Sequence, residues 1–156
     1  MQRVSIFPGS FDPFTRGHAA IVEEALRLFD KVVIAIGHNI TKQGLLDVAE
    51  RKRLIDDIYG FNPNVECQIY SGLTGDFALA VGAVAMIRGV RNTIDFEQEK
   101  ILDAVNRRLY PSLTTVVMFT PSDVVDVSSS GVRELLAFGR DVSEFLPQGV
   151  DIKKYM

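Results

Sequence analysis

Short apolar segments alternate with longer segments of helical periodicity along this chain of 156 residues. The apolar segments are rich in β-branched residues and lie near residues 3–7, 31–36, 65–69, 83–88 and 114–119. The segments between them repeat apolar residues every three or four positions, as helices do, and lie near 17–29, 47–58, 73–80, 95–109 and 129–138. This alternation predicts an α/β fold, a Rossmann-like, doubly wound five-stranded parallel sheet.

The length predicts a single domain over residues 1–156, because the chain is long enough for one core and too short for two. Two helix boundaries have local signals. Asp47 and Glu50 have the spacing of a capping box, and Gly139 follows an apolar helix as a terminating glycine would. The segment at about 147–156 is short and polar, and we expect it to be a mobile tail.

The composition excludes several classes of protein. A net charge of −3 argues against a nucleic-acid binder, which normally carries a basic excess. No apolar run approaches the roughly 20 residues of a membrane span, and the first residues lead directly into a strand instead of a signal peptide. The single cysteine, Cys67, excludes an internal disulfide. We therefore expect a cytoplasmic protein whose partners are small anions, with no nucleic-acid or membrane partner.

The first loop has the composition of a phosphate-binding turn. The predicted strand at 3–7 ends in Pro8-Gly9-Ser10-Phe11, and the helix that follows opens with Thr15-Arg16-Gly17-His18. A strand that ends in such a loop and leads into a helix presents backbone N–H groups and the positive end of the helix dipole to an anion. Ser10 and His18 add a hydroxyl and an imidazole as further donors.

Other polar residues also follow predicted strands. In a doubly wound sheet, ligands bind outside the carboxyl ends of the strands. We therefore expect five loops to meet at one edge of the sheet, and their polar residues are Ser10, His18, Lys42, Thr74, Arg88, Arg91, Ser128, Ser129 and Ser130.

Three of these segments carry a family resemblance. Thr15-x-Gly17-His18 resembles the T/HxGH motif of the nucleotidylyltransferase superfamily. Together with Ile87-Arg88-Gly89-Val90-Arg91 and Val127-Ser128-Ser129-Ser130, it makes the chain similar over nearly its whole length to the bacterial phosphopantetheine adenylyltransferases. Two features depart from the commonest pattern of that family. Ser10 stands where many members have Thr, and residues 123–126 lack the aromatic residues that other members often carry there.

The resemblance implies roles for individual residues. His18 and Ser10 would be catalytic. The substrate 4′-phosphopantetheine would meet Ser10, Lys42, Thr74 and Arg88. ATP would meet Ser10, Phe11, His18, Gly89, Val90, Arg91, Glu99, Val124, Val125, Asp126, Val127, Ser128, Ser129 and Ser130. It also implies a homohexamer and feedback binding of coenzyme A. The charge of ATP leads us to expect Mg²⁺ as well, carried by the ATP phosphates without a metal site in the chain.

Two of these segments have structural interpretations as well. Ser128 to Ser130 precede a predicted helix, where serines are common N-caps. Asp95 and Glu99 lie four residues apart at the start of another helix, so we expect one of them to orient Arg91 by pairing with it.

No nucleophile and base stand together in these motifs. Transfer of AMP to a phosphate monoester needs no general base, because the attacking oxygen is already ionised at neutral pH. Together with the family resemblance, this favours an adenylyltransferase that joins ATP and 4′-phosphopantetheine to give dephospho-coenzyme A and pyrophosphate. Two alternatives stay open: a nucleotidylyltransferase acting on another phosphate acceptor, and a non-catalytic nucleotide-binding module.

Overall fold

The computed structural model describes residues 1–156 and forms one five-stranded parallel sheet in the order β3-β2-β1-β4-β5. Its strands are β1 (Val4–Gly9), β2 (Lys31–Gly37), β3 (Val65–Tyr70), β4 (Ala83–Val90) and β5 (Thr114–Phe119). The predicted α/β class, the parallel sheet and all five strands are confirmed.

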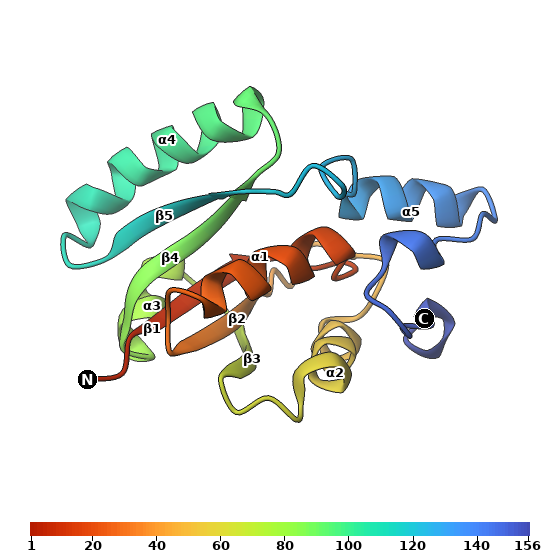
Figure 1. Ribbon diagram of the computed structural model, residues 1–156, viewed down its shortest axis with the longest axis horizontal. Coiled ribbons are helices and arrows are strands. Elements are labelled where there is room, and N and C mark those ends of the chain that lie inside the picture. Colours follow the sequence, from red (N-terminus) through yellow and green to blue (C-terminus); the bar gives the residue numbers. More distant parts are fainter.

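Five helices connect the strands or follow the last one. They are α1 (Arg16–Leu26), α2 (Val48–Tyr59), α3 (Thr74–Ala80), α4 (Thr93–Leu109) and α5 (Ser129–Ala137), followed by two short 3₁₀ turns, η1 (Ser143–Phe145) and η2 (Ile152–Lys154). Figure 1 shows α5 and the C-terminal segment beyond the carboxyl ends of the strands. No helix is long and apolar enough to span a membrane.

Both faces of the sheet are covered, as a doubly wound fold requires. The larger core of buried residues lies between the sheet and helices α1, α2 and α5, with Val22, Leu54 and Val132 among its members. A smaller core packs Ala78 of α3 and Tyr110 against Ile6 and other residues of the opposite face. Helix α4 contributes little to either core, because Glu99 is its only buried residue.

Of the two helix boundaries predicted from local signals, one is confirmed and one is wrong. Gly139 takes a positive φ of 71°, and the amides of Gly139 and Arg140 bond the carbonyls of Leu136 and Leu135, which is the predicted glycine termination of α5. The capping box at α2 is wrong. Asp47 occupies the N-cap position, but its side chain makes no capping bond.

The C-terminal segment corrects the expectation of a mobile tail. Ile152 and Tyr155 are buried, and the Tyr155 hydroxyl donates a hydrogen bond of 2.6 Å to the Asp57 carboxylate of α2. The Arg53 guanidinium lies 4.6 Å from the centre of the Tyr155 ring. Residues 147–156 therefore pack as part of the domain.

The chain order of the strands reverses between β1 and β4, the two neighbours at the middle of the sheet. Their carboxyl ends diverge into loops that lead to α1 and α4 on opposite faces of the sheet. A crevice at such a reversal point is the usual ligand site of this architecture. The phosphate-binding loop predicted at residues 8–18 lies there.

Candidate active site

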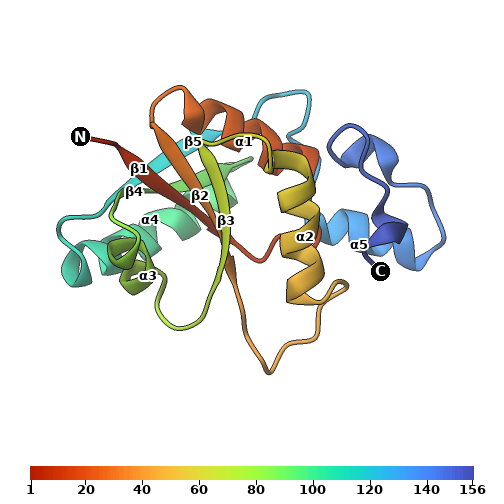
Figure 2. The same cartoon turned by 90° about the horizontal axis from the view of Figure 1, so that it is seen from below.

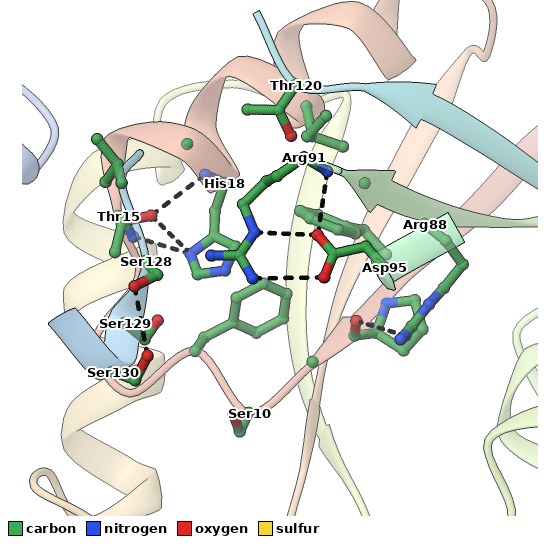
Figure 3. A pocket seen from close by; sticks show the side chains of 18 of the residues that line it. Ser10, Thr15, His18, Arg88, Arg91, Asp95, Thr120, Ser128, Ser129 and Ser130 are labelled. Atoms are coloured by element: carbon green, nitrogen blue, oxygen red, sulfur yellow. Dashed lines mark hydrogen bonds and ion pairs between the residues drawn. The ribbon is translucent and has the colours of Figure 1, made fainter. Parts of the chain in front are cut away.

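A pocket of about 470 Å³ opens at the carboxyl ends of β1 and β4. Figure 3 shows donors from three chain segments facing this pocket: the β1–α1 loop, the end of β4 with the start of α4, and the start of α5. The predicted site residues that line it are Ser10, Phe11, His18, Arg88, Gly89, Arg91, Glu99, Val127, Ser128, Ser129 and Ser130.

The His18 ring is held by the residue that caps its helix. Thr15 is the N-cap of α1; its backbone N–H donates to His18 Nδ1 at 2.9 Å, and its hydroxyl accepts from the His18 amide at 3.4 Å. Because Nδ1 accepts this bond, the proton of the neutral ring sits on Nε2. No protein group accepts from Nε2, which leaves its N–H for a ligand in the pocket.

Burial, and then the nearby Arg91 guanidinium, lower the pKa of His18 from 6.5 to about 4. Three aromatic rings surround the imidazole, with the centre of Phe11 at 4.9 Å, Phe14 at 5.3 Å and Phe7 at 6.2 Å. An apolar shell of this kind disfavours the charged form. At neutral pH His18 is therefore an uncharged hydrogen-bond donor.

Phe11 has mainly a packing role. It takes a positive φ of 48°, and its side chain is only 2% exposed because the ring lies against Phe7, Phe14 and His18. Phe11 still lines the pocket, but so little of it is exposed that its predicted ATP contact would be small.

Arg91 is oriented by Asp95, as the sequence predicted for one of the two carboxylates. The Arg91 Nε donates to Asp95 Oδ2 at 3.0 Å and the Arg91 backbone N–H donates to the same oxygen at 3.0 Å (Figure 3). These bonds hold the pKa of the Asp95 carboxyl below its usual range. The fixed guanidinium lies beside His18, where a phosphate would meet both donors.

Glu99 pairs with Arg88. The Arg88 Nε and Nη2 donate to the two Glu99 oxygens at 2.7 Å each, and Nη1 donates to the Pro8 carbonyl at 3.3 Å. This side-on pair is the geometry in which a guanidinium fork best matches a carboxylate. The predicted ATP contact of Glu99 would therefore have to use lone pairs that Arg88 leaves free.

The serines at the start of α5 combine capping with donor groups. Ser128 Oγ is the N-cap acceptor for the Gly131 amide at 3.1 Å, which confirms the structural interpretation of this serine. Ser129 Oγ donates to the Pro13 carbonyl at 2.8 Å and ties the helix to the β1–α1 loop. Ser130 is exposed, and its hydroxyl lies 3.3 Å from that of Ser128.

Several predicted ATP contacts lie outside this pocket. Val90 and Val124 are buried in the protein, and Val125 and Asp126 are exposed but do not line the pocket. The sequence could not tell which of their side chains turn into the core and which turn to solvent.

Thr74 and Lys42, the two remaining residues predicted to bind the substrate, also lie outside the first pocket. Thr74 lines a second pocket of about 270 Å³ that shares Arg88 and Glu99 with the first, and its hydroxyl lies 2.7 Å from that of Tyr70. Lys42 is exposed in the β2–α2 loop and lines neither pocket. Three of the five predicted loops therefore meet in one pocket, a fourth lies next to it, and the Lys42 loop stands outside.

The sequence analysis missed three polar residues of the pocket. Thr120 follows β5 directly, so the rule that ligands gather at strand ends would have found it. Arg133 lies one helical turn after Ser129, where an inward-facing cation can reach the same ligand as the helix N-terminus. Gln98 has no distinguishing signal in the sequence.

No group of three or more His, Cys, Asp or Glu side chains is arranged to hold a metal ion. The carboxylates that line the central pocket, Asp95 and Glu99, are each paired with an arginine. The arginine, histidine and serine side chains of the pocket are hydrogen-bond donors that suit anionic oxygens. A divalent cation in this pocket would be compatible with them only if the ligand itself supplied its oxygen ligands.

Comparisons with known proteins identify the relatives of the chain. Residues 6–135 match the cytidylyltransferase-like family. A phosphopantetheine adenylyltransferase of Porphyromonas gingivalis is 47% identical over 95% of this chain and 96% of its own, and one of Cytophaga hutchinsonii is 44% identical over 94% and 98%. The fold is similar to that of a bifunctional NMN adenylyltransferase/ADP ribose pyrophosphatase of Francisella tularensis, with a TM-score of 0.72, 18% identity, and coverage of 98% of this chain and 47% of that one.

Proposed function

Because this chain belongs to the cytidylyltransferase-like family and, within it, to the phosphopantetheine adenylyltransferases, it transfers AMP from ATP to 4′-phosphopantetheine in coenzyme A biosynthesis, and we propose that the pocket around His18 carries out this reaction. The products are dephospho-coenzyme A and pyrophosphate. The observation that supports the pocket most directly is the His18 ring, which is neutral, fixed by Thr15 and left with a free Nε2–H.

The reaction forms one bond and breaks one. An oxygen of the 4′-phosphate attacks the α-phosphorus of ATP, the new P–O bond forms, and the bond from the α-phosphorus to the bridging oxygen breaks as pyrophosphate leaves. The attacking oxygen is ionised at neutral pH and needs no base. Catalysis then consists of aligning two anions and stabilising the charge that develops between them.

The donors around the pocket have the chemistry for this. His18 Nε2–H and the Ser10 hydroxyl would donate to the α-phosphate as the charge on its oxygens grows. Each such donor contributes about 3 kcal/mol in comparable sites. Arg91 and the serines that begin α5 would hold the β- and γ-phosphates. The backbone at Gly89 would pack against the nucleotide.

The acceptor would enter from the other side of Arg88. Arg88 lines both pockets, so a phosphate bound to its guanidinium can lie in the first while the pantetheine arm extends past Thr74 in the second. Lys42 would reach this phosphate from the β2–α2 loop. Because Lys42 lies outside both pockets, this role requires residues 39–44 of the loop to move toward the ligand, while the end of the loop at Leu45 and Leu46 stays in place.

Mg²⁺ would come with ATP. The ion would be held by the triphosphate oxygens and neutralise part of their charge, and no carboxylate cluster of this chain is needed for it. The Arg91 and Ser130 side chains would contact the phosphate oxygens that the ion leaves free.

The test is pyrophosphate release from ATP and Mg²⁺, measured with and without 4′-phosphopantetheine. Release that depends on the acceptor and falls by about two to three orders of magnitude in His18→Ala is expected. The exposed His38, the only other histidine, provides the matched control, because His38→Ala should keep its activity. Release with a different phosphate acceptor would identify another nucleotidylyltransferase, and ATP binding without release would identify a non-catalytic module.

Assembly, regulation and location extend the proposal. The exposed face of α4 and the edge strand β5 carry apolar side chains that a homohexamer would bury, among them Ile101, Leu102, Val105 and Phe119. Sedimentation equilibrium would give six times the mass of one chain.

Coenzyme A would bind the same pockets as a feedback inhibitor, competing with both substrates. The expected compartment is the cytoplasm, and localisation of a tagged chain in cells tests this expectation.

A further inference from the structure

Asp12 is a buried carboxylate that the proposed chemistry does not use. Its residue is 5% exposed, and its two oxygens accept the backbone N–H groups of Leu45 and Leu46 at 2.7 and 2.8 Å. We propose that Asp12 is a positioning residue that fixes the β2–α2 loop for Lys42, so that this lysine can bind the acceptor phosphate. The inference rests on the proposed function, because it needs Lys42 to bind that phosphate.

The bonds of Asp12 join two loops that are distant in sequence. Asp12 belongs to the β1–α1 loop, between Ser10 and His18, whereas Leu45 and Leu46 end the loop that follows β2. A carboxylate that accepts two backbone N–H groups makes charge-assisted bonds, which are stronger than neutral ones. Asp12 therefore sets the position of the second loop relative to the nucleotide-binding loop.

Arg51 of α2 completes the connection. Its Nε donates to the Leu46 carbonyl at 2.9 Å and lies 3.6 Å from Asp12 Oδ1, and its Nη1 donates to the Ser10 carbonyl at 3.3 Å. The Asp12 carbonyl in turn accepts from Arg133 of the pocket at 2.8 Å. Asp12 and Arg51 therefore bond backbone groups on both sides of the junction between the loops.

Gly44 shows how closely the loops approach. A Cβ atom at this glycine would lie 2.3 Å from Asp12 Oδ2 and 2.3 Å from Arg51 Nη2. A side chain here would force the loop, the Asp12 carboxylate or the Arg51 guanidinium to shift. Glycine at position 44 therefore permits this close approach of the loop to Asp12.

The part of the loop that carries Lys42 has no other connection to the domain. The hydrogen bonds of residues 39–44 stay within the segment: the Lys42 amide bonds the Asn39 carbonyl, and Thr41 bonds the Asn39 side chain. Figure 2 shows this loop projecting at the same end of the sheet as the loop between β3 and α3. The anchor at Leu45 and Leu46 directly follows this exposed segment and begins three residues after Lys42, so it determines which positions Lys42 can reach.

The test is a double-mutant cycle on the Michaelis constants. Asp12→Asn keeps the size of the side chain but offers only one acceptor oxygen to the two amides. We expect the KM for 4′-phosphopantetheine to rise about fivefold to tenfold, with the KM for ATP changed less than about twofold. In a Lys42→Ala background, Asp12→Asn should change the acceptor KM by less than about twofold, because the group being positioned is gone.

Three results would overturn the inference, and each has a separate meaning. An equal rise in both Michaelis constants would indicate that Asp12 supports the domain as a whole. A full effect of Asp12→Asn in the Lys42→Ala background would show that it does not act through Lys42. An unchanged acceptor KM in Lys42→Ala alone would remove the proposed role of Lys42, while acceptor-dependent pyrophosphate release would still establish the proposed function.

A second variant distinguishes the proposed positioning role from a folding defect. Arg51→Lys keeps the positive charge beside Asp12 but loses the fork that bonds the Leu46 and Ser10 carbonyls. It should give the same selective rise in the acceptor KM and the same dependence on Lys42, and a rise that persists in Lys42→Ala would contradict the inference. Thermal unfolding of each variant reports separately on the stability of the domain.

Discussion

The neutral state of His18 has a consequence for stability that can be measured without substrate. Its pKa is about 4 in the folded protein and near 6.5 in an unfolded chain. Between these values the unfolded chain binds a proton that the folded one excludes. The free energy of unfolding therefore falls as the pH is lowered from about 6.5 towards about 4.

The size of the effect follows from the lowered pKa. Each factor of ten in proton affinity corresponds to 1.36 kcal/mol, so the contribution of His18 should fall by about 2.5 kcal/mol between about pH 7.5 and about pH 4.5. Carboxylates also titrate in this range, and their contribution has to be subtracted. His18→Gln removes the titration of His18 alone, and His38→Gln is the matched control for the loss of a histidine.

Urea unfolding at the two pH values gives the comparison. The wild-type protein and His38→Gln should lose about 2.5 kcal/mol more stability on acidification than His18→Gln does. If all three proteins lost the same amount, His18 would titrate alike in the folded and unfolded states. The imidazole would then be charged in part near neutrality, and its role as an uncharged donor fixed by Thr15 would be refuted.

Three further predictions concern single positions. A Cβ atom at Gly17 would meet nothing nearer than 3.5 Å, so Gly17→Ala should fold normally. Because Gly17 lines the pocket in which the nucleotide would bind, the added methyl group should raise the KM for ATP at least about tenfold, and an unchanged KM would contradict this. Glu99→Gln weakens the bidentate pair with Arg88 and should lower the free energy of unfolding by about 1–2 kcal/mol in urea titrations, whereas Glu99→Asp should lower it less. Burial raises the pKa of the Cys67 thiol to about 12, so a thiol reagent should label the native protein slowly and the urea-unfolded protein fast, and rapid native labelling would show that the thiol is accessible.

The fold could be predicted closely because it depends on patterns that are local in sequence. Each β-branched run became a strand and each periodic segment a helix. The apolar runs and the helical periodicity both reflect which side chains are buried. The differences lie at the ends of elements. Helix α1 stops at Leu26 instead of continuing to Phe29, and Asp47 begins α2 without the predicted capping bond.

The site could be predicted only as far as strand ends determine it. The rule for doubly wound sheets placed His18, Arg88 and the α5 serines at one edge, and the structure brings them to one pocket. The partner of each charge could not be read from the sequence. The i,i+4 spacing of Asp95 and Glu99 allowed either to pair with Arg91, and the choice depends on where β4 ends relative to α4.

Asp12 shows why the remaining interactions escaped prediction. In the sequence it is one acidic residue of a turn, and its partners are 33 and 34 positions away. Contacts of this range depend on how the two loops close over the sheet, which no local pattern encodes. The same is true of the bond between the Ser129 hydroxyl and the Pro13 carbonyl, which spans 116 positions.

The arginine pairs explain how a pocket for polyanions can be ordered before it binds one. Unpaired guanidinium groups at Arg88 and Arg91 would repel each other and sample many rotamers, and both costs would be met when a ligand binds. Glu99 and Asp95 remove these costs in the free protein, and they leave the Nη1 of Arg91 without a protein acceptor. A phosphate then meets donors that already point in fixed directions, beside a histidine that adds a donor without adding charge. Orientation in advance of binding is what a reaction without a general base requires, because its rate depends on alignment and on charge stabilisation alone.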